Sequence, residues 1–185
     1  MATPTSLPAT FVAGNVLTAA QMNALRGAFR ILQVVSTEKS DTFTSSATSF
    51  TAITGLSASI TPTDAASKVL VIVNIKGASE RATASATFQY RVMRGATAIG
   101  IGDARSNRER VTGSLVTRDY GLGAALNADT AVILDSPATT SATTYSVQGR
   151  SSAVATWYLN RAELDSDLSF YFTSISSVTL LEVSA

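Results

Sequence analysis

The chain has 185 residues and contains no cysteine and no histidine. Without cysteine there is no disulfide and no thiol nucleophile, and without histidine there is no imidazole for acid–base catalysis. Zinc sites of the usual kind also depend on these residues, so they are excluded. Carboxylates, hydroxyls, lysine and arginine remain, which disfavours most classes of enzyme. We therefore expect a protein that is not an enzyme and that has neither a metal site nor a cofactor.

Charged residues are also scarce. They make up 15% of the chain, and 14 basic and 13 acidic residues leave a net charge of +1, so no overall field draws the molecule to nucleic acid. No apolar run approaches the ~20 residues that span a bilayer. The N-terminus lacks the basic and apolar regions of a signal peptide. We expect no nucleic-acid partner, no membrane insertion, and assembly in a cytoplasm.

The one convincing helical pattern lies near the N-terminus, in the sequence FVAGNVLTAAQMNALRGAF at 11–29. Thr18 can cap this helix, and Gln21 stands three residues later, where its side chain can reach back to the cap backbone. The pattern predicts a helix over 18–29 within an N-terminal segment of residues 1–30.

A narrow apolar stripe runs along this predicted helix. Such a stripe favours docking to a neighbouring protein or a three-helix bundle on a symmetry axis; the alternative is packing against the chain's own β-domain. A single helix in front of a β-rich body indicates an attachment segment. The residues that we expect to anchor it are Leu17, Met22, Leu25 and Phe29.

From Ile31 onward the apolar pattern changes from helical to β. The run KVLVIVNIK at 68–76 is the most apolar and predicts a central strand buried on both faces. Residues 86–94 alternate in polarity and then turn into a second strand, which predicts a hairpin. Residues 36–49 are rich in serine and threonine, and we expect a loop or a weakly packed edge there.

Many short strands separated by turn signals are typical of sandwich and jelly-roll folds. We expect residues 31–185 to form one all-β domain, an antiparallel β-sandwich or jelly roll. The expected strands are 31–35, 50–60, 68–76, 86–94, 97–101, 114–117, 131–134, 143–148, 156–160, 168–173 and 178–183.

A cluster of arginines is the first candidate binding site. The segment DARSNRER at 103–110 brings Arg105, Arg108 and Arg110 together with Asp103 and Glu109. An arginine fork can bind a carboxylate, a phosphate or an acidic sugar. The alternative is a solvated loop with internal ion pairs, which the low worth of surface pairs favours.

Trp157 is the second candidate ligand-binding residue. With Tyr158, and near Asn160 and Arg161, it could form a patch on which a sugar stacks. Because side chains alternate along a strand, one of the two aromatic rings points into the core. This structural interpretation of the pair is the favoured one.

Three weaker patterns have simple structural alternatives. Asp165 and Asp167 could hold Ca²⁺, but a turn explains them without the further oxygens that this ion needs. Asp129 and Asp135 could serve a glycosidase only if their carboxyl groups lie about 5–10 Å apart. The sequence GLGAA at 121–125 lacks the Lys-Ser/Thr ending of a phosphate-binding loop, so a turn is favoured.

Several short segments together carry a family resemblance. AGNVLTAAQMN at 13–23 is similar to an N-terminal pattern, F/W-x-x-G-x-x-L-T-A-x-x-(M/L)-N, that precedes a fibre or appendage domain in tailed-bacteriophage virion proteins. Four later segments resemble the β-domain of small phage fibre and tail-associated proteins. They are ITGLSASITP at 53–62, SKVLV at 67–71, GIGDA at 100–104 and VTLLEV at 178–183.

The resemblance implies a virion structural protein, commonly a homotrimer, assembled in the host cytoplasm and located in the virion. The implied partners are other virion proteins of the tail, the portal region or the capsid, together with a host surface glycan. The expected function is a fibre or tail-associated appendage that contributes to host attachment. The alternatives are a capsid decoration or head-fibre protein and a glycan-degrading tailspike enzyme. The short chain without solenoid repeats weighs against the tailspike.

Overall fold

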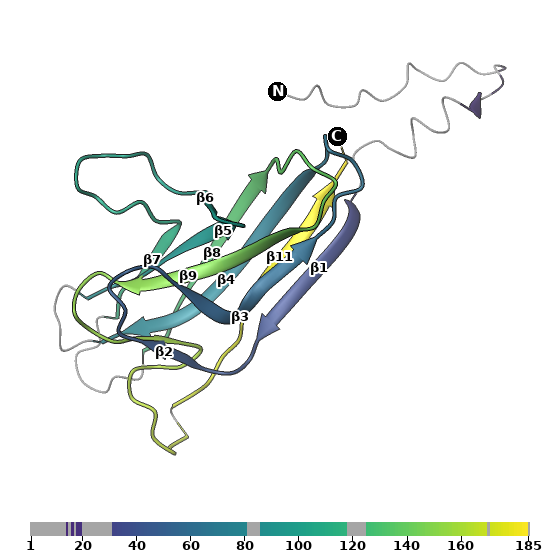
Figure 1. Cartoon of the computed structure of the whole chain (residues 1–185). Coiled ribbons are helices and arrows are strands. Elements are labelled where there is room, and N and C mark those ends of the chain that lie inside the picture. The colour runs from purple at the N-terminus through teal and green to yellow at the C-terminus, as the bar shows by residue number, and fades with distance from the viewer. Residues whose placement is uncertain are drawn as a thin grey trace.

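The computed structural model of this protein is all-β, and every strand pair in it is antiparallel (Figure 1). The structure describes residues 14, 16, 18–19, 31–80, 86–117, 125–169 and 171–184. The strands are β1 (Ile31–Lys39), β2 (Phe43–Ser45), β3 (Thr51–Ile60), β4 (Lys68–Ser79), β5 (Phe88–Arg94), β6 (Thr97–Ile99), β7 (Gly113–Leu115), β8 (Asn127–Asp135), β9 (Thr143–Ser151), β10 (Trp157–Leu159) and β11 (Ser176–Val183).

One sheet is built around β4, and we call it the β4 sheet. β8 pairs with one edge of β4 and β11 with the other, and β1 pairs with the far side of β11. β10 pairs with the last residues of β4, Gly77–Ser79, and β2 pairs with β10. The short strands β10 and β2 therefore continue the lines of β11 and β1.

The second sheet, the β5 sheet, has β3, β9 and β5 as neighbours in that order. β6 and β7 pair with successive parts of the free edge of β5, β6 with Val92–Arg94 and β7 with Phe88–Tyr90. A register shift in β3 lies between Ala52 and Ser57.

The inner faces of the two sheets share one hydrophobic core. Along β4 the alternate residues from Val69 to Ile75 are fully buried, as the period of a strand requires. Phe88 of β5 stacks on Trp157 of β10, with 4.5 Å between the ring centroids and 6° between the planes. The core thus joins strands from the beginning, middle and end of the domain.

Most expected strands are confirmed to within a few residues. The central place of β4 in its sheet is confirmed, but only one of its faces is fully buried, since Leu70 and Ile72 on the other face are partly exposed. The predicted hairpin is also confirmed, because β5 turns into β6 with Arg94 opposite Thr97.

The expectation of a loop at 36–49 is corrected by the structure. β1 continues to Lys39, and β2 follows at Phe43–Ser45. Ser36 and its neighbours extend the ladder with β11, and a hydrogen bond of 2.9 Å joins the hydroxyls of Ser36 and Thr179. Serine and threonine lowered the apolar signal here without interrupting the backbone pairing.

The strand expected at 168–173 is also corrected. Within the described residues this segment makes only a bridge between Arg161 and Thr173, and a turn forms where the Tyr171 N–H donates to the Leu168 carbonyl at 3.0 Å. The predicted helix over 18–29 lies outside the described residues except for Thr18 and Ala19, as does the GLGAA segment except for Ala125.

Candidate assembly face

The outer face of the β4 sheet carries a row of aliphatic side chains across four strands. The register aligns Leu70 of β4 with Leu134 of β8 on one side and with Leu181 of β11 on the other, and Leu181 with Val34 of β1. The fully buried residues of β4 alternate with Leu70, so this row points away from the core. The row crosses the full width of the sheet.

Further aliphatic residues flank this row, in adjacent rows that also hold Lys68 opposite Val183 and Thr179 opposite Ile72. Val132 of β8 lies opposite Ile72 of β4, and Val183 at the end of β11 pairs with Ile31 at the start of β1. We call these eight residues the aliphatic face. They are Ile31, Val34, Leu70, Ile72, Val132, Leu134, Leu181 and Val183.

The edge strands contribute the most exposed members of the aliphatic face. Val132 is 63% exposed and Leu134 is 56% exposed, and Ile31 and Val34 are exposed by more than half as well. Single exposed aliphatic residues are ordinary on protein surfaces, but a contiguous group on a regular sheet marks an interaction site. Among the described residues, these edge-strand side chains are left exposed.

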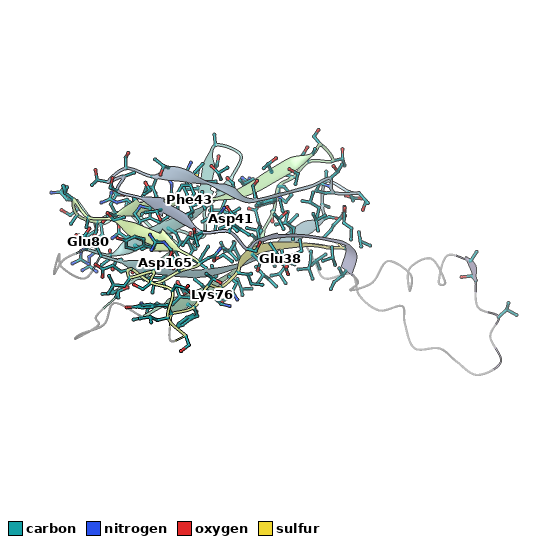
Figure 2. The ribbon with its side chains drawn as sticks, turned by 90° about the horizontal axis from the view of Figure 1, so that it is seen from below. Glu38, Asp41, Phe43, Lys76, Glu80 and Asp165 are labelled. Carbon is teal, nitrogen blue, oxygen red and sulfur yellow. The ribbon has the colours of Figure 1, made fainter. Side chains whose placement is uncertain are left out.

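The same sheet face becomes polar toward its other end. The next ladder positions hold Thr130, Asn74, Ser177 and Glu38 in one row, and Lys76 follows on β4. Glu38 and Lys76 are labelled in Figure 2. The Asn74 side-chain oxygen is buried and accepts no hydrogen bond within the described part of the chain.

Sequence reasoning found the strands of this face but not the face itself. Residues Ala131 to Leu134 of β8 are all apolar, so their polarity does not show which side chains point outward. The register with β4 decides this, because Ile133 pairs with inward-facing Val71. Four successive apolar residues are unusual on an edge strand, and this run was the signal in the sequence that could have indicated the aliphatic face.

The aliphatic face lies next to the start of β1. Ile31 is the first residue of β1 and stands opposite Val183, near the end of the chain. The four residues predicted to anchor the N-terminal segment, Leu17, Met22, Leu25 and Phe29, lie outside the described residues. They precede Ile31 in the sequence, and β1 begins at this end of the sheet (Figure 1).

The predicted arginine cluster lies in the exposed connection between β6 and β7. Arg110 donates to the Gly102 carbonyl at 2.6 Å, and Glu109 pairs with Arg150 of β9 at 2.8 Å. Arg105 and Arg108 are exposed, and the Arg108 backbone N–H donates to the Arg105 carbonyl at 3.2 Å. The geometry is that of a surface loop tied down by its own polar groups.

The expectation that Trp157 could bind a ligand is corrected, because the structure buries its side chain completely. The ring is covered by Phe88 on one side and lies 5.4 Å from the Phe43 ring. Tyr158, which points to the opposite face, carries the Arg161 guanidinium 4.4 Å from its ring centre. Alternation placed the larger ring inside, as the structural interpretation of this pair expected.

Asp129 and Asp135 are separated along β8 and serve different contacts. Six residues of strand put their backbones about 20 Å apart, which is too far for a glycosidase pair. Asp129 accepts a hydrogen bond from the Tyr90 hydroxyl at 2.8 Å, and Asp135 accepts one from Tyr145 at 2.7 Å. Burial and these hydrogen bonds raise the pKa of both tyrosines.

Asp135 also accepts hydrogen bonds from Arg94 at 2.8 and 2.9 Å. Because Arg94 belongs to β5 and Asp135 to β8, this ion pair joins the two sheets. This contact between the sheets explains why the Asp135 carboxylate lies next to the core.

No group of three or more acidic residues is placed to hold a metal ion within the described ranges. None of the described helical residues belongs to a helix long and apolar enough to cross a membrane. No protein-family model matches the chain, and no curated protein is significantly similar to it.

Proposed function

We propose that this protein is a virion structural protein of a tailed bacteriophage, a homotrimeric fibre or tail-associated appendage. The observation that carries the proposal is the aliphatic face, which offers an extended apolar surface for other copies of the chain. The sequence resemblance to phage appendage proteins supplies the biological setting. In this account the N-terminal segment anchors the trimer to other virion proteins, and the β-domain contributes to host attachment.

The strand order supports a jelly roll as the finer description of the fold. With β10 and β2 counted as continuations, the β4 sheet reads β1, β11, β4, β8, and the β5 sheet reads β3, β9, β5, followed by β6 and β7. Each sheet thus interleaves early and late strands, as two nested Greek keys do. Double-sheet jelly rolls recur in viral structural proteins.

The dimensions of the β4 sheet support a three-fold arrangement. Four strands at a spacing of about 4.8 Å make a face about 19 Å wide. If three such faces form the sides of a triangular prism, the backbone of each sheet lies about 5.5 Å from the three-fold axis. This is close to half of the ~10 Å that separates two sheets packed face to face. The side chains of three faces would therefore fill the centre. Four faces would stand about 9.5 Å from the axis and leave a channel by the same geometry.

A measurement on particles tests the virion assignment. Phage particles purified from a host that carries this gene are expected to contain the chain in a fixed number of copies, measured by quantitative mass spectrometry against the major capsid protein. A few dozen copies or fewer fit an appendage, and hundreds of copies would point to a capsid decoration protein instead. Particles that lack the chain would contradict the proposal.

A paired substitution connects the assembly face to this assignment. Leu134→Asp places a charge in the aliphatic face, whereas Ser57→Asp places one at an exposed position of the β5 sheet. Particles from a host that supplies Leu134→Asp are expected to lose most of the protein, and those with Ser57→Asp to retain it. Equal incorporation of both variants would separate virion assembly from the aliphatic face.

A further inference from the structure

The connection between β10 and β11 lies at the end of the domain opposite the start of β1 and the end of β11. β11 begins at Ser176, opposite Lys39, and ends at Val183, opposite Ile31. Eight residues of strand separate these ends by about 25 Å. In Figure 1 the connection is the yellow-green loop at the bottom of the molecule. An appendage held by its N-terminus would present this loop outward.

Buried hydrogen bonds hold the base of the loop. Asn160, which is fully buried and has a φ of 60°, donates to the carbonyls of Lys39 at 2.7 Å and Asp41 at 2.9 Å. Its side-chain oxygen accepts a hydrogen bond of 2.7 Å from the Ser176 hydroxyl. The Asn160 side-chain amide thus has partners for both its nitrogen and its oxygen. These hydrogen bonds fix the point at which the loop leaves the sheet.

Arg161 organises the first half of the loop. Its guanidinium stacks on Tyr158 and donates to the carbonyls of Ala162 and Glu163, both at 3.2 Å. The same guanidinium lies 3.7 Å from the Asp165 carboxylate. Asp165, labelled in Figure 2, is therefore positioned by a side chain that is itself held in place.

A shallow depression of about 420 Å³ opens on this loop. Phe172 is 52% exposed on its wall, and Leu168 is exposed to a similar degree. The residues that line the depression are Asp165, Ser166, Asp167, Leu168, Tyr171, Phe172 and Thr173. Aromatic rings and carboxylate oxygens thus meet on one shallow, mostly polar surface.

The chemistry of the lining selects a class of ligand. Two carboxylates disfavour an anion, and they supply fewer oxygens than the six to eight that Ca²⁺ takes. A neutral saccharide matches both halves of the lining, because its hydroxyls donate to carboxylates and its C–H faces pack on aromatic rings. The volume suits one or two sugar rings, since ligand pockets begin at about 300 Å³.

We propose that the depression at 165–173 binds a neutral saccharide, with Phe172 as the stacking residue and Asp167 as a hydrogen-bond acceptor. This inference rests on the proposed function, because a host surface glycan is the ligand that an attachment protein meets. It moves the sugar site from Trp157, which is buried, to the loop that the fold presents at the far end of the domain.

Saturation-transfer NMR on the full-length protein tests the site. The probes are the methyl glycosides of glucose, galactose, mannose and N-acetylglucosamine at millimolar concentration, with glucuronic acid as the charged comparison. At least one neutral probe is expected to bind, and Phe172→Ala and Asp167→Asn are each expected to weaken that binding at least tenfold. Glucuronic acid is expected to bind more weakly than the neutral sugars.

Leu164→Ala is the matched control, because Leu164 is exposed on the same loop but does not line the depression. This variant should bind like the unchanged protein, and circular dichroism should show all three variants folded. The inference is overturned if no neutral probe binds, if Phe172→Ala binds as well as Leu164→Ala, or if glucuronic acid binds best. A trimer that binds no sugar would refute this site alone, and a monomer that binds sugar would refute the trimer alone.

Discussion

At the scale of single residues, Glu182 holds together three parts of the chain. It is fully buried near the end of β11 and accepts hydrogen bonds from Gln33 of β1 at 2.6 Å, from the Thr63 backbone N–H at 2.7 Å and from the Thr63 hydroxyl at 2.8 Å. Burial raises the pKa of this carboxyl, but the hydrogen bonds from Gln33 and Thr63 outweigh it, so the pKa lies below its usual value.

A substitution of Glu182 should therefore change how stability depends on pH. Because the folded pKa is below the unfolded one, the carboxylate stabilises the fold above the unfolded pKa, and this stability is lost as the pH falls through the folded pKa. Glu182→Gln is expected to lower the free energy of unfolding by about 1–3 kcal/mol at pH 7. Urea unfolding should show the difference shrinking by pH 3.

The comparison for Glu182 is Asp103→Asn, which removes an exposed loop carboxylate. It should change the free energy of unfolding by no more than about 0.5 kcal/mol at either pH. If Glu182→Gln behaves in the same way, the three hydrogen bonds do not stabilise the native state and the account of this residue is wrong.

The sequence carries part of this information at the residue scale. Alternation from Val178 and Leu180 predicts that Glu182 faces inward, just as alternation predicts that one of Trp157 and Tyr158 is buried. It does not predict the donors, because Thr63 lies 119 positions away in sequence. Long-range polar contacts of this kind come only with the fold.

At the scale of elements, two glycines allow β4 and β9 to pass under the central aromatic stack. A Cβ on Gly77 of β4 would lie 2.6 Å from the Tyr158 carbonyl oxygen and 2.9 Å from the Phe88 ring. A Cβ on Gly149 of β9 would lie 2.8 Å from both Phe88 and Trp157. Close packing of β10 on β4 therefore depends on the absence of a side chain at these points.

Gly77→Ala is expected to destabilise the protein by about 1–3 kcal/mol, because a backbone oxygen cannot give way as a flexible side chain can. The measurement is the midpoint of urea unfolding. Gly102→Ala is the control, since nothing lies within 4 Å of its added Cβ. Equal stability of the two variants would mean that β10 does not pack on β4 as described.

The sequence predicted strands correctly where apolar residues form a strong pattern. The predictions were wrong where pairing with another strand, or the lack of it, determines the structure. β4 and β11 follow from their apolar residues, whereas the second half of β1 is a strand because β11 pairs with it. In β3, Ile53 and Leu56 are both buried although three positions separate them, since a register shift with Gly55 at a φ of 83° rotates the strand between them. Residues 168–173 alternate like a strand, yet the described residues include no strand that pairs along them.

At the scale of the whole molecule, the two ends of the domain have different chemistry. The end at which β1 starts and β11 ends carries the aliphatic face, and the opposite end carries the depression at 165–173. The pattern of short apolar strands and turns predicted an all-β fold, the composition predicted few charges, and the resemblance supplied the expectation of a trimer. None of these could locate the proposed assembly surface, because the aliphatic face exists only when four strands from distant parts of the sequence lie side by side.

An interface of aliphatic side chains should depend little on ionic strength. Screening weakens contacts between exposed charges, whereas high salt leaves apolar burial intact or strengthens it. We therefore expect the oligomer to persist in 1 M sodium chloride, measured by analytical ultracentrifugation. Dissociation at high salt would indicate that charged residues such as Glu38 and Lys76 hold the copies together instead.

The most direct test of trimer formation through the aliphatic face is the molar mass of the full-length protein by light scattering after size exclusion. We predict a mass near three times the 19.2 kDa of one chain for the unchanged protein and for Ser57→Asp. For Leu134→Asp we predict a mass near 19.2 kDa, because its exposed position should leave the domain folded. A monomeric or dimeric unchanged protein, or a Leu134→Asp variant that remains a trimer, would contradict trimer formation through this face.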